Sequence, residues 1–157
     1  MKKILLEIVI ILCFLTFCVY VIKYFVYKKH IDNFLSFTNN NIEKCTIKKT
    51  IIKPPKILSE FADVEDVNDF TNKLASIIRQ HYTKVTIMTP DLPSKYEIIM
   101  KETNTEWHIY FAQSSNKTNP GVIDWHIMVR HEMTEGGTIR LDKQGVNMIL
   151  NLIDEYF

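Results

Sequence analysis

The sequence predicts an α+β fold: an N-terminal transmembrane helix, then a helix, an antiparallel meander of four or five strands, and a final helix. Three observations predict it. One long apolar run fills most of the first 29 residues. Two later segments carry apolar residues at helical spacing, and the segment between them alternates with a period of two. Helices that flank an antiparallel meander pack on one face of its sheet.

The apolar run extends from Ile4 to Ile22, with Glu7 as its only charge. About twenty apolar residues is the length that a helix needs to cross a bilayer. We therefore expect a membrane anchor that includes Ile4, Leu12, Phe17 and Ile22. A cleaved signal peptide would end in small residues, and the run contains no Ala or Gly, so we expect the helix to be retained.

The orientation of this anchor is left open by its flanking charges. Lys2 and Lys3 precede the run, whereas Lys23, Lys28 and Lys29 follow its apolar part. The two ends nearly cancel under the positive-inside rule. The short basic tail is typical of an uncleaved signal-anchor, which places the domain outside the cytoplasm, and the basic far flank favours the opposite. We expect a single-pass protein of the cell membrane with an extracytoplasmic domain.

Composition predicts three parts: an anchor at residues 1–29, a basic stalk at 30–58 and an acidic α+β domain at 59–157. The stalk has five lysines against two acidic residues, and the domain has nine Lys and Arg against fifteen Asp and Glu. Pro54-Pro55 marks the expected boundary, and Ile42–Lys53 before it is a strand or an extended tether. An acidic domain argues against a nucleic-acid partner. The basic stalk is either a solvated spacer or a segment that lies over anionic lipid.

Cysteine usage excludes a disulfide framework within the domain. Cys13 and Cys18 lie in the anchor, so Cys45 is alone in the rest of the chain. Disulfide pairing of Cys45 between two chains stays open.

The first helix of the domain is predicted over Val64–Tyr82, with Asp63 as its N-cap. The last is predicted to begin after a second cap, Asp142. Their apolar stripes, at the spacing of an amphipathic helix, are Val67, Phe70, Leu74, Ile77, Ile78 and His81, and Val146, Ile149, Leu150, Ile153 and Phe157.

The strands are predicted from alternation bounded by turn residues. They are Lys84–Thr89, Tyr96–Lys101, Trp107–Ala112, Ile123–Met133 and a short edge strand Thr138–Leu141. Thr134-Glu135-Gly136-Gly137 is predicted to be the turn before the last strand.

Two of these strands contain a similar four-residue segment, Glu106-Trp107-His108-Ile109 and Asp124-Trp125-His126-Ile127. If His108 lies opposite His126, one face carries Trp107, Ile109 and Phe111 with Ile123, Trp125 and Ile127. The other face then carries His108, Tyr110, His126, Met128 and Arg130. A shift of one residue would break this match.

These two histidines raise two hypotheses. His108, His126 and Glu132 are weak candidates for a metal site, but two imidazoles fall short of the three or four ligands that zinc needs. His131-Glu132 also lacks the spacing that places two ligands on one helical face. Two polar residues on the uncovered face of a sheet are the favoured explanation, because the ligand count falls short, and we expect no cofactor.

Catalytic chemistry has no pattern in its favour. Ser94, Ser114 and Ser115 occupy predicted turns without a nucleophile-elbow sequence. The glycines form no phosphate-binding loop. We therefore lean towards a chain that is not an enzyme.

The remaining candidate is protein binding by the uncovered sheet face at Tyr110, His126, Met128 and Arg130, since aromatic, Met and Arg side chains are enriched at interfaces. A plain solvated sheet face explains the same residues about equally well. The function we expect is a membrane-anchored interaction module in an envelope or secretion complex, or an immunity or inhibitor protein. The acidic domain favours a basic protein partner. A metal-binding or hydrolytic enzyme domain and a cytoplasm-facing regulator are the alternatives.

Overall fold

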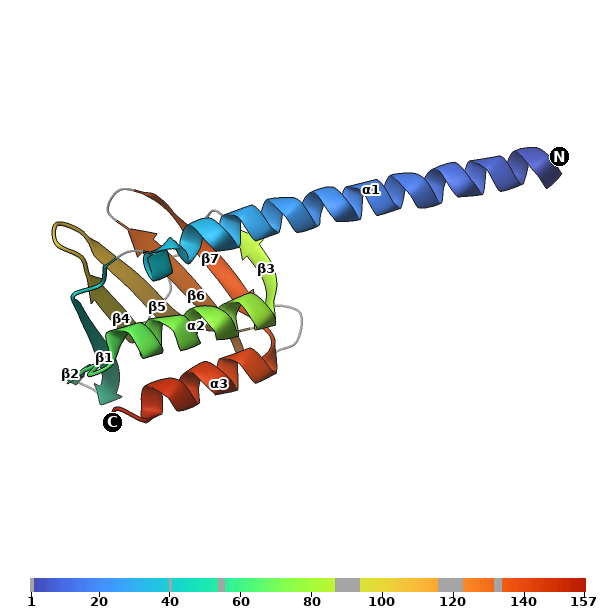
Figure 1. Ribbon diagram of the computed structural model, residues 1–157. Coiled ribbons are helices and arrows are strands. Elements are labelled where there is room, and N and C mark those ends of the chain that lie inside the picture. Colours follow the sequence, from blue (N-terminus) through green and yellow to red (C-terminus); the bar gives the residue numbers. More distant parts are fainter. Residues whose placement is uncertain (1, 40, 54–55, 87–93, 116–122, 132–133) are drawn as a thin grey trace.

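The computed structural model describes residues 2–39, 41–53, 56–86, 94–115, 123–131 and 134–157 of the 157-residue chain. A long helix leads into a domain in which helices cover one face of a sheet (Figure 1). The helices are α1 (Lys2–Phe34), the short 3-10 helix η1 (Ser36–Asn39), α2 (Val67–His81) and α3 (Lys143–Asp154). The strands are β1 (Lys44–Lys53), β2 (Lys56–Asp63), β3 (Tyr82–Thr86), β4 (Ser94–Lys101), β5 (Glu106–Ser115), β6 (Ile123–His131) and β7 (Thr134–Leu141).

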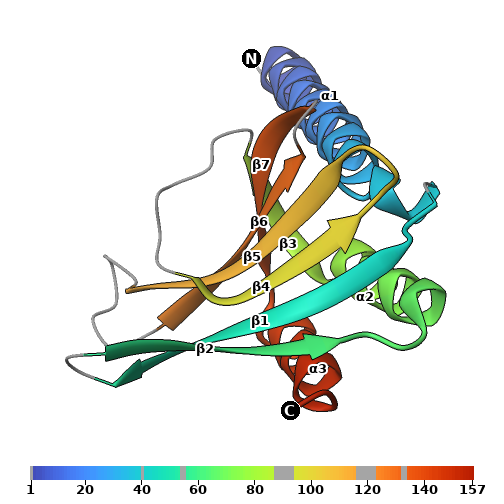
Figure 2. The same ribbon diagram turned by 90° about the vertical axis from the view of Figure 1, so that its left-hand side faces the viewer.

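The seven strands form one antiparallel sheet in the order β2-β1-β4-β5-β6-β7-β3. The α+β class with a long apolar N-terminal helix is confirmed, but the predicted count of four or five strands is wrong. The additional strands come from residues 44–63, where β1 pairs with both β2 and β4 (Figure 2). The loose alternation there had allowed a strand or a tether, and it forms the strand. The expected boundary at Pro54-Pro55 lies outside the described residues, and the strands on either side of it belong to the same sheet.

The final strand also differs from the prediction. Thr138–Leu141 was expected to be an edge strand, but β7 begins at Thr134 and lies between β6 and β3. The predicted turn at Thr134–Gly137 is therefore part of a strand. Gly137 is needed for a different reason, because a Cβ atom at this position would overlap the ring of Phe34.

Helix α1 is long and apolar enough to cross a bilayer. Its 33 residues rise about 50 Å at 1.5 Å per residue. Large apolar side chains are exposed along it, among them the predicted anchor residues Leu12, Phe17 and Ile22, and Ile4 lies in the same helix. Such a surface is unfavourable in water and suits lipid.

The last turns of α1 have a different role, because they enter the core of the domain. Ile31, Phe34 and Leu35 are 2, 6 and 0% exposed. Phe37 in η1 is fully buried and meets the Trp107 ring edge-on, with 5.7 Å between centroids. The helix therefore passes into the domain without a linker, and Figure 1 shows it running out past β3, away from β2.

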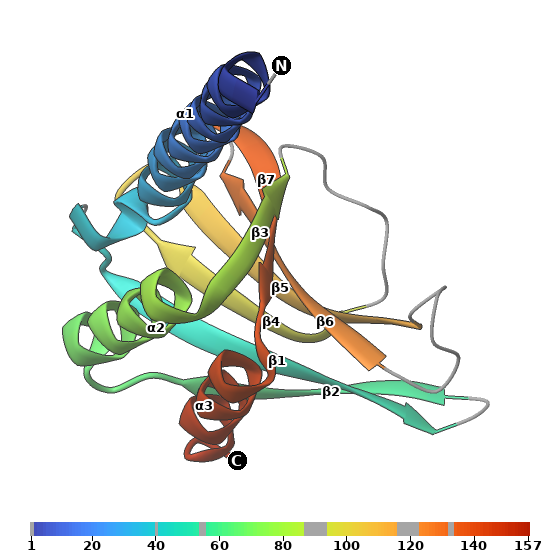
Figure 3. The same ribbon diagram turned by 90° about the vertical axis from the view of Figure 1, so that its right-hand side faces the viewer.

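The two domain helices lie together on the same face of the sheet (Figure 3). Asp142 caps α3 as predicted, since its carboxylate accepts from the Gly145 amide at 2.8 Å. The cap of α2 is Asp66 rather than Asp63, and the helix begins three residues later than predicted. Asp63 is still part of β2, where it accepts from Thr46 and pairs with Lys44. Pairing with β1 therefore takes precedence over helix initiation there.

The predicted register between β5 and β6 is wrong, but the predicted faces are kept. His108 lies opposite Arg130, and His126 lies opposite Ala112. The pairing is displaced by four residues, and an even displacement leaves each side chain on its face. Trp107, Ile109, Phe111, Ile127 and Val129 are all buried on the helix-covered face. The side chains of Ile123 and Trp125 lie outside the described part of the chain.

We expect Gly137→Ala to lower the free energy of unfolding by about 2 kcal/mol, because the new methyl group overpacks the site of Phe34. Phe34→Ala should also destabilise, by about 3 kcal/mol, because it leaves a cavity. The double variant should lose much less than the sum, since the methyl group then enters that cavity. Denaturation of the chain in detergent micelles, followed by tryptophan fluorescence, measures these values. Lys84→Ala on the exposed surface of β3 is the control, and strictly additive losses would contradict the contact.

Candidate interaction surface

The face of the sheet opposite the helices, here called the second face, carries all four predicted partner-binding residues. Tyr110 and Met128 are directly opposite each other, and His126 and Arg130 lie on either side of Met128 along β6. Their exposure is uneven, because Arg130 is exposed, Tyr110 and His126 are half-buried and Met128 is only 5% exposed. Arg130 and Tyr110 are therefore the members of this set best placed to meet a partner.

The centre of the second face is a group of charges that the sequence did not indicate, organised around Glu97 of β4. Its Oε1 lies 2.9 Å from Nδ1 of His108, and its Oε2 accepts from Lys48 Nζ at 3.2 Å. Nε2 of His108 is 3.4 Å from Glu106, which also pairs with Lys101 at 2.9 Å. The His108 ring stacks on Tyr110 with 5.9 Å between centroids. We call Lys48, Glu97, Lys101, Glu106 and His108 the charge cluster.

Electrostatics within the charge cluster favour ionised carboxylates. Burial raises the pKa of Glu97, but hydrogen bonds from His108 and Lys48 outweigh burial and leave the pKa below its ordinary value. Burial, together with the nearby Glu97 carboxylate, raises the pKa of Tyr110, so its phenol stays protonated. Each carboxylate of the cluster has a cationic partner, an arrangement that holds strands β1, β4 and β5 in register rather than one poised for proton transfer.

The separation of His108 and His126 argues against the predicted metal site. His108 and His126 belong to strand pairs four residues apart, or about 13 Å along a strand. A zinc ion binds imidazole nitrogen at about 2 Å, so the two rings cannot share one ion. The third candidate, Glu132, lies outside the described residues. Within the described ranges, no three His, Cys, Asp or Glu side chains converge as a ligand set.

The most exposed apolar side chains of the domain lie on β1 and β2. Ile52, Ile57 and Phe61 are 67, 72 and 63% exposed and project from the second face, where Ile52 and Ile57 are directly opposite each other. We call these three residues the hairpin patch. Leu58 is also exposed but projects from the other side of β2. Beyond α1, the only other exposed large apolar side chains in the described part of the chain are Met148 and Phe157.

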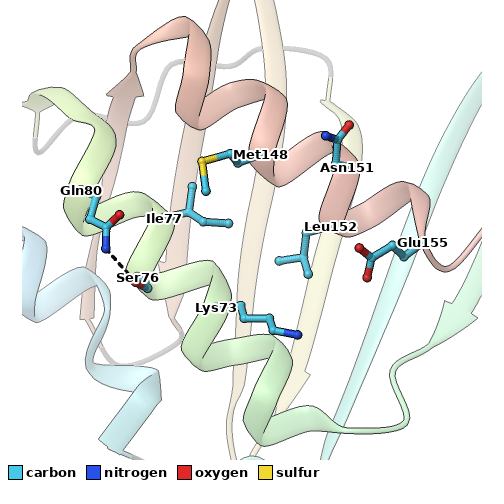
Figure 4. A pocket seen from close by; sticks show the side chains of 8 residues that line it. All are labelled: Lys73, Ser76, Ile77, Gln80, Met148, Asn151, Leu152 and Glu155. Atoms are coloured by element: carbon cyan, nitrogen blue, oxygen red, sulfur yellow. Dashed lines mark hydrogen bonds between the residues drawn. The ribbon is translucent and has the colours of Figure 1, made fainter.

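A shallow groove of about 440 Å³ lies between α2 and α3, on the outside of the helix layer (Figure 4). It is lined by Lys73, Ser76, Ile77, Gln80, Met148, Asn151, Leu152 and Glu155. Ile77 and Leu152 form an apolar floor, and Gln80 donates to Ser76 at 3.2 Å along one side. Lys73 pairs with Asp69 at 2.6 Å, and that hydrogen bond raises the pKa of its ammonium group. Nothing in the groove resembles a nucleophile with an adjacent base.

Cys45 is unsuited to pairing between chains. Its side chain is fully buried beneath the helices, and burial raises the pKa of the thiol to about 12. A disulfide with a second chain would require the core to open, because only the thiolate reacts and it must be accessible.

Comparisons with family models, with curated proteins and with solved structures found no match to this chain. Its function must therefore be argued from its own residues. Sequence patterns missed Glu97 and Lys48, although alternation in Tyr96–Lys101 already placed a carboxylate on the face opposite the apolar residues. They missed the hairpin patch because residues 30–58 were interpreted as a stalk.

We expect Glu97→Gln to lower the free energy of unfolding by about 1 kcal/mol at pH 7, because Lys48 and His108 lose their anionic partner. The pKa of Glu97 is lowered by folding, so its contribution is present above its ordinary value of 4.5 and disappears as the pH falls below that. Urea denaturation at pH 7 and pH 3.5 (about one unit below that ordinary value) should show the difference shrink. The exposed Glu65→Gln, between β2 and α2, is the control. A loss of equal size at both pH values would contradict the charge cluster.

Proposed function

We propose that this chain is a single-pass membrane protein whose domain binds another protein, in an envelope or secretion complex or as an immunity or inhibitor protein. The hairpin patch is the observation that carries the proposal. Three large apolar side chains, each at least 63% exposed, lie on one face at one edge of the sheet. Ile52 and Ile57 are directly opposite each other, and Phe61 lies four residues farther along β2 on the same face. Exposed apolar side chains grouped at one sheet edge favour an interaction site.

The position of the hairpin patch supports the proposal. β2 and β3 are the two edges of the sheet, and α1 leaves the domain beside β3 (Figure 1). With α1 in a bilayer, the patch stands at the edge farther from the anchor and is accessible to a partner. The charge cluster borders the patch through Lys48, which lies opposite Phe61. An apolar centre with a charged border is the usual composition of a protein interface.

A membrane-bound enzyme is the less favoured alternative. The charge cluster has neutralised carboxylates, and the α2–α3 groove contains no nucleophile beside a base. A metal site at His108 and His126 is opposed by their separation along β5 and β6. Binding therefore accounts for the exposed apolar groups, which catalysis leaves unexplained.

We expect the C-terminus to lie outside the cytoplasm, as for an uncleaved signal-anchor with a short basic tail. C-terminal fusions to reporters that are active only outside or only inside the cytoplasm measure this. A control with Lys23, Lys28 and Lys29 replaced by Gln should keep the same orientation, since removing positive charge after the helix strengthens the outside arrangement. Activity of the inside reporter alone would instead favour a cytoplasm-facing regulator.

We expect a photo-crosslinking residue at Phe61 to capture a discrete protein in intact membranes, whereas the same residue at Asn72 on the exposed surface of α2 should not. Both positions are exposed, so the fold tolerates both changes. In a separate variant, the photo-crosslinking residue stands at Ile57 and Phe61 is native. Adding Phe61→Asp to that variant should abolish capture, because a charge is poorly accommodated in an apolar contact. Capture in equal yield at Phe61 and Asn72, or none at either, would oppose an interaction module with this surface.

A further inference from the structure

Strand β2 leaves one side of its backbone without a partner strand in the described sheet, where it pairs with β1 alone. Each residue from Lys56 to Phe61 is exposed. Natural proteins usually protect a sheet edge with a short strand, a bulge or a covering element, because free N–H and C=O groups recruit another strand. The opposite edge follows this pattern, since β3 has five residues, a register shift and α1 beside it. β2 has eight residues and a regular register.

The side chains of β2 suit a second copy of the same strand running antiparallel to it. Its amino-terminal end carries Lys56, and its carboxyl-terminal half carries Glu60 and Asp63. An antiparallel copy therefore brings the basic end of one strand to the acidic end of the other. Apolar residues lie between the charges, so the strand is complementary to itself in charge and in polarity.

Symmetry restricts the possible registers. A twofold axis perpendicular to the sheet keeps each face on its side, so residues that lie opposite each other are separated by an even number. The axis must then pass midway between the two copies of one β2 residue, which lie directly opposite each other. An axis at Glu60 would set two carboxylates directly opposite each other, which destabilises a strand pair.

An axis at Leu58 would set Lys56 opposite Glu60 but leave Ile57 opposite Ser59, whereas an axis at Ser59 joins the exposed apolar side chains of the second face. It sets Ile57 of one copy opposite Phe61 of the other, twice, on the second face, so that each Ile52–Ile57 pair is extended by a Phe61 from the second copy. On the other face, Lys56 lies diagonally from Glu60 of the second copy, within reach of an ion pair. Serine at the axis adds neither bulk nor charge.

We propose that two copies of this chain pair antiparallel through β2, centred on Ser59, and extend the sheet across both domains. The proposal rests on the interaction module described above and identifies its partner as a second copy. Because α1 runs out past β3 in the direction that leads away from β2, the twofold axis places the two anchors at opposite ends of the joined sheet (Figures 1 and 2). The pair therefore links two bilayers rather than two positions in one.

Cysteine cross-linking of the full chain in detergent micelles tests the register. In a Cys13→Ala, Cys18→Ala background, Ser59→Cys should form a disulfide-linked dimer under mild oxidation, because each cysteine faces its own copy. Glu60→Cys on the neighbouring residue should give about tenfold less dimer, because its two copies are offset along the strand and not directly opposite. The buried Cys45 remains in both variants. No dimer at Ser59, or equal yields at both positions, would overturn the pairing.

Two further measurements separate this pairing from the more general function. Phe61→Asp in the Ser59→Cys chain should reduce dimer about tenfold while its thermal melt stays unchanged, since Phe61 is 63% exposed. Two differently labelled populations of proteoliposomes should cluster with the unmodified chain and stay apart with Phe61→Asp. Dimer without clustering would overturn the two-bilayer arrangement. Photo-capture of a different protein at Phe61, with no Ser59 dimer, would overturn self-pairing and leave the interaction module standing.

Discussion

The contact between the end of α1 and the sheet determines how the rest of the molecule is placed. Phe34 lies over Gly137 of β7, and Ile31 and Leu35 are buried beside it. The contact depends on a missing side chain, because any Cβ at Gly137 would occupy the space of the aromatic ring. Since α1 is one helix from Lys2 to Phe34, fixing its last turn fixes the direction of the apolar segment relative to every strand.

The two faces of the sheet are stabilised by different interactions. The helix-covered face is apolar, and Trp107 of β5 is buried there in one core with Phe37 of η1 and Phe70 of α2. The second face is held by charge pairs across β1, β4 and β5, with Glu97 at their centre. Neutralised charges leave little to drive binding there, whereas the hairpin patch leaves apolar surface in water. The site of interaction is therefore best sought at the edge of the sheet.

Local patterns predicted the parts of this fold that local physics decides. The apolar run, the stripe of α2 and the Asp142 cap each depend on residues close in sequence, and so does the alternation that placed Trp107, Ile109 and Phe111 together. The strands at residues 44–63 were harder, because their pairing depends on β4, far along the chain. The register between β5 and β6 was wrong because it was set from the repeated Trp-His-Ile segment, whereas His108 pairs with Arg130. Gly137 was misread as a turn because its actual constraint is a ring from α1.

The same contrast between features set by neighbouring residues and features set by distant ones applies to the candidate surface. A shared face for Met128 and Arg130 followed from period-two alternation, and Tyr110 of β5 joined them through an assumed register of the correct parity. Their exposure did not, because burial of Met128 depends on what surrounds it in three dimensions. Glu97 carries no motif, and its importance comes from two partners on strands β1 and β5. Exposure of Ile57 and Phe61 is visible only once β2 is known to be an edge.

With α1 in a bilayer, as proposed, the continuity of this helix also couples the domain to the thickness of that bilayer. A helix whose apolar length differs from that of the hydrocarbon layer adjusts by tilting. A hinge between anchor and domain would absorb this tilt, but here the helix ends inside the core, with Phe34 seated on Gly137. A thinner bilayer would therefore rotate the whole sheet and lower its far edge towards the lipid. In that arrangement the height of β2 above the lipid would depend on the thickness of the bilayer.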